Sequence, residues 1–292
     1  MPNVYGSVAV IVDVGPRIRR VVLDVPQVAE LNMPGGADEA VGIYFPGPGQ
    51  SSPPPMEYRD GEWGHFDLDD EPEGRNYSVR HRGPGPNQIT CDFVLHQRGI
   101  ASDWVRRARI GDRVLLDHAR SWYRPESASD WQLLIADLAG LPALARILDE
   151  LPRDATAAVI VEVADEADLD YLPVRPDIPI VTTIGTGNGH APSRLTELAE
   201  AHSHPEGRGY CWFAGEAQTT REVRKHLRRE YGWVAGQYDI VGYWRFDSET
   251  WDRKYEAVSD EVEAVYARAL ADGKGDKIAS EEYDEALERV GL

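Results

Sequence analysis

Cysteine is nearly absent from this chain of 292 residues, which contains only two. Cys91 and Cys211 each lie in an apolar run, and they are far apart in the sequence. Neither belongs to a spacing typical of a metal-ligand set or a redox-active dithiol. The scarcity of cysteine argues against a disulfide scaffold and predicts two buried thiols in a cytosolic protein.

Long apolar runs and basic charge are also lacking. No stretch approaches the roughly 18 apolar residues of a membrane span, and the first residues lack the basic and apolar regions of a secretory leader. The net charge of -19 argues against a nucleic-acid partner, because phosphate binding needs a basic surface. With 42% hydrophobic and 28% charged residues, we expect a soluble, globular, cytoplasmic protein.

The glycine-rich fingerprint Gly-x-Gly-x-x-Gly is absent as well, so no motif directly supports a dinucleotide-binding Rossmann unit. The eight histidines are scattered. His202 and His204 lie in a loop-like polar run, which predicts a solvated loop rather than a metal site. We therefore expect no bound metal.

Short β-branched segments separated by glycine and proline occupy the first 126 residues, which is typical of an antiparallel β domain. One helix is expected near residues 103–108, with Ser102 placed to cap it. Six strands with one helix predict a small antiparallel barrel. The strands are expected at residues 8–14, 19–25, 41–45, 75–80, 89–96 and 112–117.

Beyond about residue 125, apolar strands alternate with helical segments. This alternation predicts parallel strands covered by helices. Strands are expected at 131–137, 157–163, 178–183, 209–214 and 238–244, and helices at 140–151, 193–201 and 216–229. We thus expect a barrel domain over residues 1–126, a parallel α/β domain over 127–246, and an acidic helical extension over 247–292.

The segment from Arg75 to Arg80 alternates polar with apolar or aromatic residues, as a half-buried strand does. One face would carry Arg75, Tyr77 and Val79, and the other Asn76, Ser78 and Arg80. Arginine provides a planar fork for phosphate, and tyrosine an aromatic plate. The segment resembles the Arg-x-Tyr-Ser/Thr-x-Arg motif of siderophore-interacting proteins, the flavin-dependent ferric-siderophore reductases of the ferredoxin-reductase superfamily.

Further segments resemble the same family in the same order along the chain. They are Asp92 to His96, Gly99 to Ser102, Ala136 to Ala143, Trp212 to Ala217, and Gly242 to Arg245. The resemblance implies that the barrel binds FAD, with the pyrophosphate cradled at the helix start that follows Gly99. The flavin contacts it implies are Arg75, Tyr77, Ser78, Asp92, Val94, His96, Gly99, Ala101, Ser102, Glu216 and Trp244.

One departure from the family concerns the substrate. Many members carry Val-Lys-Leu-x-Phe-Pro where this chain has Val41 to Pro46, so the lysine linked to anionic iron complexes is here Gly42. Either arginines elsewhere replace it or the substrate is less anionic. The candidate substrate contacts are Arg120, Arg124, Arg245 and Lys254.

The resemblance implies reduction of cytoplasmic ferric siderophores with NADH, NADPH or ferredoxin as the electron donor. Reduction would release the iron, because the hard oxygen donors of a siderophore hold the ferrous ion far less well. Two alternatives stay open: an NAD(P)H–flavin oxidoreductase acting on quinones or free flavin, and a non-catalytic carrier of siderophore or flavin. The sequence names neither the siderophore nor the donor, nor the role of the last helices.

Overall fold

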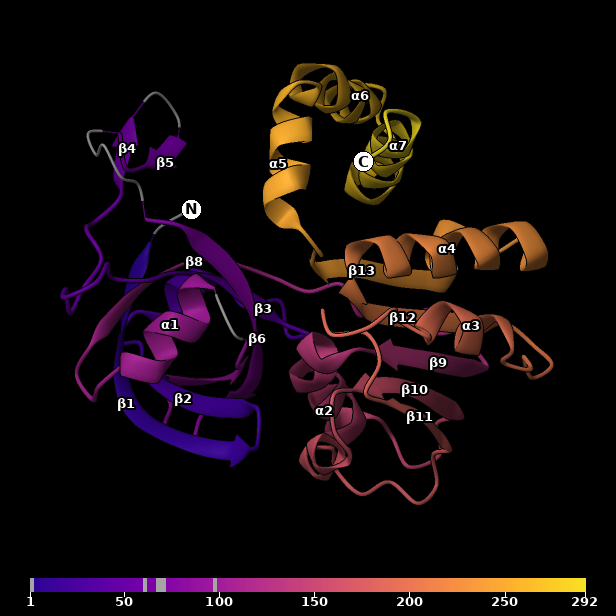
Figure 1. Ribbon diagram of the computed structural model, residues 1–292, viewed down its shortest axis with the longest axis horizontal. Helices are drawn as coiled ribbons and strands as arrows, with labels where there is room; N and C mark the ends of the chain where they lie inside the picture. Colours follow the sequence, from indigo (N-terminus) through magenta and orange to yellow (C-terminus); the bar gives the residue numbers. More distant parts are fainter. Residues whose placement is uncertain (1–2, 60–61, 67–71, 97–98) are drawn as a thin grey trace.

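The computed structural model describes residues 3–59, 62–66, 72–96 and 99–292. Its N-terminal part is a closed antiparallel barrel with strand order β1-β2-β7-β6-β3-β8, and β8 pairs back onto β1 to close it (Figure 1). The six predicted strands are therefore confirmed. Their bounds are β1 Val4–Gly15, β2 Ile18–Asp24, β3 Ala40–Tyr44, β6 Gly74–Arg82, β7 Gln88–Val94 and β8 Arg113–Arg120.

The barrel core is filled by β-branched and aromatic side chains, and one helix, α1 (Ile100–Arg107), packs against it. Trp104 of α1 lies against Phe45 and Phe93, with ring centroids 5.0 and 5.8 Å apart. The helix begins three residues before the predicted start, so Ser102 lies inside it and does not cap it. The η1 turn (Val28–Leu31) and a small hairpin, β4 (Glu57–Arg59) with β5 (Glu62–Gly64), were not predicted.

The second part is a parallel sheet of order β11-β10-β9-β12-β13. Helix α2 packs on one face against Val159 and Val161, while α3 and α4 pack on the other against Ile160. The predicted parallel α/β domain is therefore confirmed. The strands are β9 Trp131–Ala136, β10 Ala157–Val163, β11 Ile180–Ile184, β12 Gly209–Glu216 and β13 Tyr238–Trp244; the helices are η2 Leu138–Gly140, α2 Leu141–Glu150, η3 Glu166–Tyr171, α3 Leu195–Glu200, α4 Ala217–Tyr231 and η4 Ala235–Gln237.

The sequence predicts a solvated loop for His202 and His204 after α3. In the structure the rings of both residues also pack against aromatic neighbours. His204 stacks on Tyr231 with ring centroids 3.9 Å apart, and His202 lies 5.8 Å from His204. Both rings pack near Trp131. Among the residues that the structure describes, no group of histidine, cysteine or acidic side chains is arranged to hold a metal ion.

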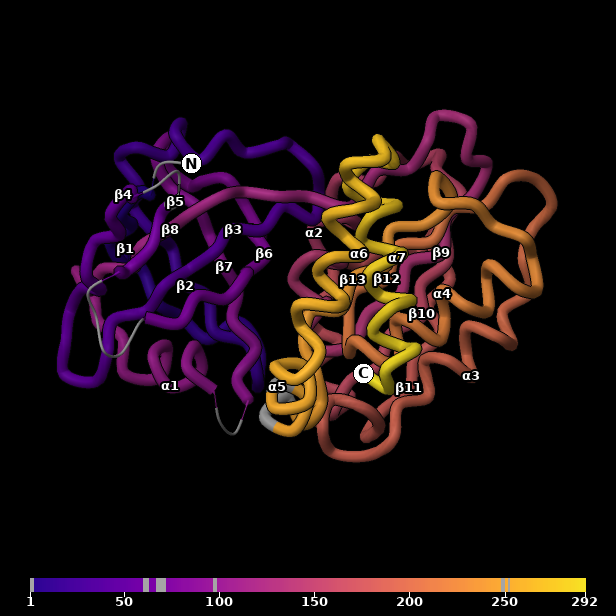
Figure 2. Tube along the Cα trace, turned by 90° about the horizontal axis from the view of Figure 1, so that it is seen from above, coloured from indigo at the N-terminus to yellow at the C-terminus, as the bar shows by residue number. Residues whose placement is uncertain are grey.

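Three helices follow the sheet, as predicted: α5 (Ser248–Glu256), α6 (Ser259–Ala271) and α7 (Gly275–Arg289). Seen from above, α6 and α7 lie over β12 and β13 (Figure 2). Salt bridges join α4 to α7, for example Arg224 to Asp284 at 2.7 Å and Arg228 to Glu285 at 2.7 Å. No helix within the described ranges is long and apolar enough to cross a membrane.

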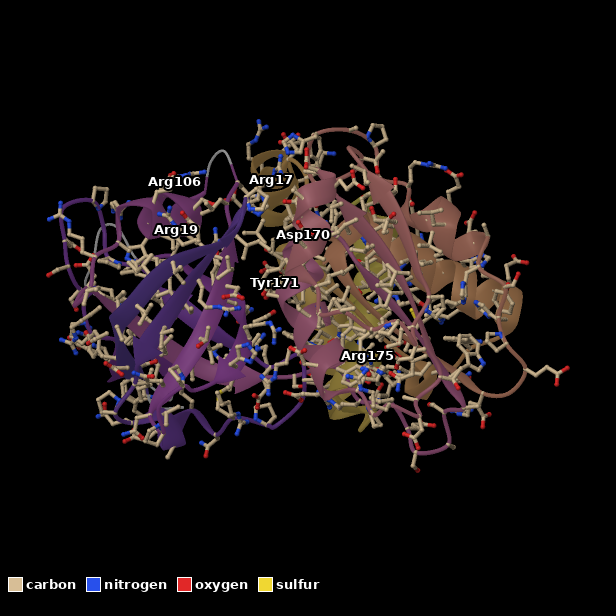
Figure 3. All side chains as sticks on the ribbon, turned by 90° about the horizontal axis from the view of Figure 1, so that it is seen from below. Arg17, Arg19, Arg106, Asp170, Tyr171 and Arg175 are labelled. Atoms are coloured by element: carbon tan, nitrogen blue, oxygen red, sulfur yellow. The ribbon has the colours of Figure 1, made fainter. Side chains whose placement is uncertain are left out.

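The barrel and the α/β domain meet along a seam of buried charged groups, which Figure 3 shows from below with Arg17 and Tyr171 labelled. Arg17 of the barrel bonds Asp168 of η3 at 3.0 Å. The buried carboxylate of Glu39 lies 3.0 Å from Arg146 of α2 and also binds Arg82. These bonds fix the two domains against each other.

Candidate functional site

The described residues line one cavity in the barrel domain and another in the α/β domain. The first, which we call the barrel cavity, has a volume of about 650 Å³ and lies between the proline-rich loop after β3, the start of β6 and helix α1. The second, which we call the strand-edge cavity, has a volume of about 750 Å³ and lies at the carboxyl ends of the parallel strands, under α5. Both volumes fall in the range of ligand pockets.

The barrel cavity adjoins a helix start that can accept an anion. Gly99 precedes α1 with a φ of 131°, which a residue with a side chain rarely adopts, and among the residues that the structure describes no side chain caps the helix. The first N–H groups of α1 therefore remain available for a phosphate. Ile100 lines the cavity together with Glu73, and Glu73 holds the guanidinium of Arg75 at 2.5 Å.

The two faces of strand β6 contact different parts of the molecule: one packs toward the barrel core and the other faces the seam. Tyr77 packs toward the barrel core, with its ring centroid 4.5 Å from that of Phe93 and 5.9 Å from that of Phe45, and Phe45 also lines the barrel cavity. Ser78 faces the seam, where its hydroxyl donates to that of Tyr243 on β13 at 3.5 Å. The predicted faces are confirmed, but Arg75, Tyr77 and Ser78 do not converge on one point.

The β7 residues named by the sequence lie along the seam. Asp92 is buried and accepts bonds from Arg20 at 2.7 Å and from the Tyr171 hydroxyl at 2.5 Å, so its carboxylate joins the two domains. Val94 packs against the α/β core. At His96, desolvation together with the charges of His190 and Arg106 lowers the pKa of the imidazole. Ser102 accepts a bond from the His96 N–H at 3.0 Å.

The strand-edge cavity has a buried acid at its floor. Asp137, directly after β9, accepts the N–H groups of Ala139 and Gly140 at the start of η2 and the indole N–H of Trp244 at 2.6 Å. Burial raises the pKa of Asp137 to about 6, although these bonds oppose the shift. The bond fixes the indole of Trp244 over the end of the sheet, where it lines the cavity.

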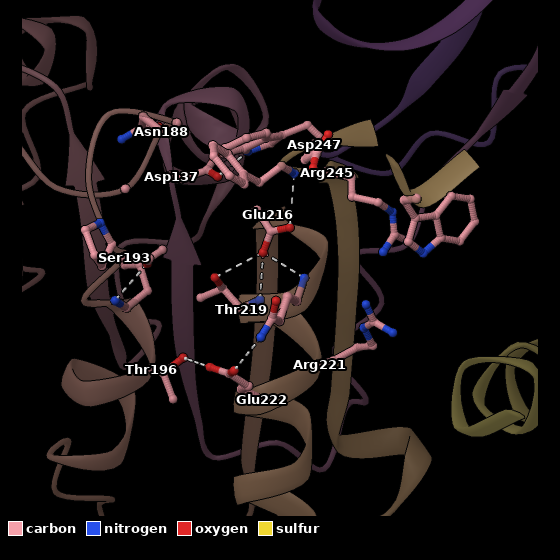
Figure 4. A pocket seen from close by; sticks show the side chains of 18 of the residues that line it. Asp137, Asn188, Ser193, Thr196, Glu216, Thr219, Arg221, Glu222, Arg245 and Asp247 are labelled. Carbon is pink, nitrogen blue, oxygen red and sulfur yellow. Dashed lines mark hydrogen bonds between the residues drawn. The ribbon is translucent and has the colours of Figure 1, made fainter. Parts of the chain in front are cut away.

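Two more acids lie near the ends of β12 and β10, the strands on either side of β9, and Figure 4 labels the first, Glu216. Glu216 ends β12, and its carboxylate accepts the N–H groups of Gln218 and Thr219 at 2.7 and 2.9 Å, which caps α4. Glu162 of β10 is buried and accepts the Thr186 hydroxyl and the Arg194 N–H. The starts of η2 and α4 are thus occupied by the chain's own carboxylates, whereas no described side chain caps the start of α1.

The site residues predicted from the sequence divide among these three places. Arg75 and Tyr77 contact two residues that line the barrel cavity, Glu73 and Phe45, and Gly99, Ala101 and Ser102 are chain neighbours of its lining residues Ile100 and Asp103. Ser78, Asp92, Val94 and His96 lie along the seam. Glu216, Trp244, Arg245 and Lys254 line the strand-edge cavity. Arg120, at the end of β8, and Arg124, which binds the Ser121 carbonyl, line neither cavity.

Sequence reasoning missed several residues of the strand-edge cavity, among them Asp137, Glu162 and Glu222. Asp137 and Glu162 lie at the ends of apolar runs. Because ligands of open parallel sheets bind outside the carboxyl ends of the strands, those positions carried a usable signal. Glu222 carried no such signal, since it depends on how α3 and α4 pack.

The residues at the barrel cavity fit an FAD. An uncapped helix start and Arg75 can meet the two phosphates, and the ring of Tyr77 provides an aromatic surface. The cavity beside them can take the adenosine half. The Ser78 hydroxyl at the seam can bond the edge of the ring system, between the barrel and Tyr243.

Comparison with known proteins gives the family. The siderophore-interacting FAD-binding domain matches residues 7–120, and the siderophore-interacting protein model matches residues 129–247. A siderophore utilization protein from T. fusca is similar in structure, with a TM-score of 0.71 and 30% identity over 84% of this chain and 93% of that chain.

Relatives with similar sequences include an uncharacterized protein of Mycobacterium tuberculosis, 32% identical over 66% of this chain and 72% of the relative. The ferric vibriobactin reductase of Vibrio cholerae is 26% identical over 65% and 72% of the two chains. The NADPH-dependent ferric-chelate reductase of Escherichia coli is 26% identical over 72% and 80%. Together with the barrel, the seam and the parallel sheet, these matches show that the chain belongs to the siderophore-interacting protein family.

Proposed function

We propose that this protein is an FAD-dependent reductase that releases iron from ferric siderophores in the cytoplasm. The observation that supports the proposal is the start of α1, which no described side chain caps, at the barrel cavity that Glu73, the partner of Arg75, also lines, in a chain of this family. When bound, FAD supplies the exchange between two-electron donors and one-electron acceptors that ferric iron requires. The residues that would hold it are Arg75 and the α1 N–H groups at the phosphates and Ser78, beside Tyr243, near the ring system. Tyr77, on the opposite face of β6, would support the site from the barrel core.

The acceptor that we propose is a ferric complex with little negative charge. A Cβ added at Gly42 would lie 1.9 Å from Oδ1 of Asp117, so the Asp117 carboxylate fills the space of the missing side chain. Asp117 also lies 2.8 Å from His118. An acid in place of a lysine disfavours an anionic complex, which supports a neutral or cationic ferric hydroxamate over a tris-catecholate.

The test begins with the purified protein. It should bind FAD and be yellow, and after anaerobic reduction it should be reoxidised by a ferric hydroxamate with ferrous iron captured by a ferrous-specific chelator. Faster turnover with quinones or free flavin than with ferric complexes would show that the acceptor is a quinone or free flavin and not a ferric siderophore. Reoxidation by neither class would favour a carrier, and failure to bind FAD would end the proposal.

A matched pair of variants tests the phosphate contact. Arg75→Ala should weaken FAD binding by about ten- to a hundredfold, the effect of losing a charge-assisted hydrogen bond. Arg229→Ala removes the same charge from the exposed end of α4 and should leave binding unchanged. Equal affinity of the two variants would exclude Arg75 from the site.

A further inference from the structure

The strand-edge cavity is elongated between two distinct ends. Figure 4 shows Asp137 and Asn188 at one end and Thr196 with Glu222 at the other. The first end carries Trp244 and His190, and His190 approaches His96 of the barrel across the seam. A ligand that fills the cavity would therefore reach the flavin side with one end and the α3–α4 groove with the other.

The starts of η2 and α4, at the ends of the two central strands, do not favour a phosphate. Asp137 occupies the N–H groups at the start of η2, and Glu216 those at the start of α4. Neither of these two helix starts can hold a dinucleotide pyrophosphate in the way usual for open α/β sheets. Arg245 directly after β13, Lys254 of α5 and Arg221 of α4 also line the cavity, and Figure 4 shows Arg245 and Arg221 on the side away from Thr196. The Arg245 guanidinium is held 4.0 Å over the Trp251 ring.

The far end of the cavity is acidic. The carboxylate of Glu222 accepts the Thr196 hydroxyl at 2.9 Å and the Gln218 amide at 3.3 Å, so its position is fixed between α3 and α4. Arg194, at the start of α3, is bound to Glu197 at 2.7 Å and does not line the cavity. The described lining residues therefore place a carboxylate and no cation beside Thr196.

We propose that this cavity takes NADH in preference to NADPH, and that Glu222 sets the preference. The inference rests on the proposed function, because it requires a flavin at the seam. The nicotinamide would lie by Trp244, the pyrophosphate toward Arg245 and Lys254, and the adenosine ribose by Glu222. A carboxylate accepts a bond from a ribose 2′-hydroxyl and repels a 2′-phosphate.

The reaction balances with this donor. A hydride, two electrons with one proton, leaves the dihydronicotinamide for the flavin, and the oxidised dinucleotide departs. Two ferric ions would then accept one electron each from the reduced flavin, which would release the transferred proton to solvent and return to its oxidised form. The E. coli relative is named as NADPH-dependent. The inference therefore predicts that this chain prefers the other dinucleotide, NADH.

The experiment compares both dinucleotides on the FAD-loaded protein. Anaerobic flavin reduction should favour NADH over NADPH by about ten- to a hundredfold in rate over Kd, and calorimetry should rank NAD+ above NADP+ in the same way. Glu222→Gln should bring the two donors within a few fold, mainly by improving NADPH. Glu230→Gln removes one charge from the exposed end of the same helix and should leave the ratio unchanged.

A substrate analogue makes the test independent of folding. The 2′-deoxy analogue of NADH should bind the native protein about tenfold more weakly than NADH, and Glu222→Gln should shrink that difference. Equal use of NADH and NADPH, or an unchanged ratio in Glu222→Gln, would overturn the inference. If neither dinucleotide binds while the chemically reduced flavin still reduces ferric hydroxamate, this inference fails and the reductase function stands.

Discussion

Replacing Asp38 should loosen the joint between the barrel and the parallel sheet. Its carboxylate is 1% exposed and accepts four donors: the Ser121 hydroxyl at 2.6 Å, the N–H groups of Trp122 and Tyr123 at 3.0 and 2.8 Å, and the Trp212 indole at 3.0 Å. Ser121, Trp122 and Tyr123 belong to the connection after β8, and Trp212 to the centre of β12. One side chain thus ties the barrel, the interdomain connection and the sheet together.

The size of the effect follows from these donors. Asp38→Ala leaves four donors without their acceptor, at about 1–3 kcal/mol for each that stays dry. Removing a desolvated charge and admitting water offset part of that cost. We expect a net loss of about 3 kcal/mol in the free energy of unfolding. Asp38→Asn keeps one oxygen and should cost about half as much.

Urea unfolding followed by tryptophan fluorescence measures these differences, provided that the m-value is unchanged. Asp154→Ala, a truncation of an exposed acid, is the control and should stay within about 0.5 kcal/mol of the native protein. A loss below about 1 kcal/mol in Asp38→Ala would show that water satisfies the donors as well as Asp38 does. Equal costs for alanine and asparagine would show that the retained oxygen contributes nothing.

Three other predictions concern buried groups. Desolvation and the charges of His202 and His226 lower the pKa of His204 to about 4, so the folded state binds fewer protons than the unfolded state below pH ~6.5. Stability should fall by up to about 2 kcal/mol as the pH drops from about 6.5 to about 4, after allowing for the partly exposed ring; urea midpoints that do not change with pH would contradict this. Burial raises the pKa of the Cys91 and Cys211 thiols, so neither should react with a thiol reagent until the protein is unfolded, and rapid labelling of the native protein would be the opposite result. Gly140→Ala would place a Cβ 2.4 Å from the Ala214 carbonyl oxygen and should cost about 2 kcal/mol in the urea assay, whereas an unshifted midpoint would mean that η2 can move away from β12.

The barrel strands could be predicted because burial imposes a period of two on the sequence, and β1 begins with a strict alternation of buried and half-buried residues. The start of α1 could not, because it depends on the backbone of Gly99 rather than on a capping side chain. The β4–β5 hairpin was missed for a related reason. Its strands have three residues each, too few to show a period.

The candidate site was predictable where it follows strand order and unpredictable where it follows packing. The alternation on β6 correctly separates Tyr77 from Ser78, but only the fold reveals that one faces the barrel core and the other Tyr243. Arg245 and Lys254 meet in one cavity because α5 folds back over β13. Glu222 of α4 lines the same cavity, where its carboxylate binds the Thr196 hydroxyl of α3. This contact depends on how the two helices pack, so no local sequence pattern predicts it.

The helix starts on the two sides of the seam differ, and the difference bears on how long each ligand should stay. At α1 no side chain of the described residues bonds the first N–H groups, so a phosphate placed there gains the benefit of the helix dipole. At η2 and α4 a phosphate would have to displace Asp137 or Glu216, each already bonded to those groups. If the proposed function holds, FAD at the barrel cavity should therefore stay bound through many turnovers. The dinucleotide in the strand-edge cavity should bind weakly enough to leave after each turnover.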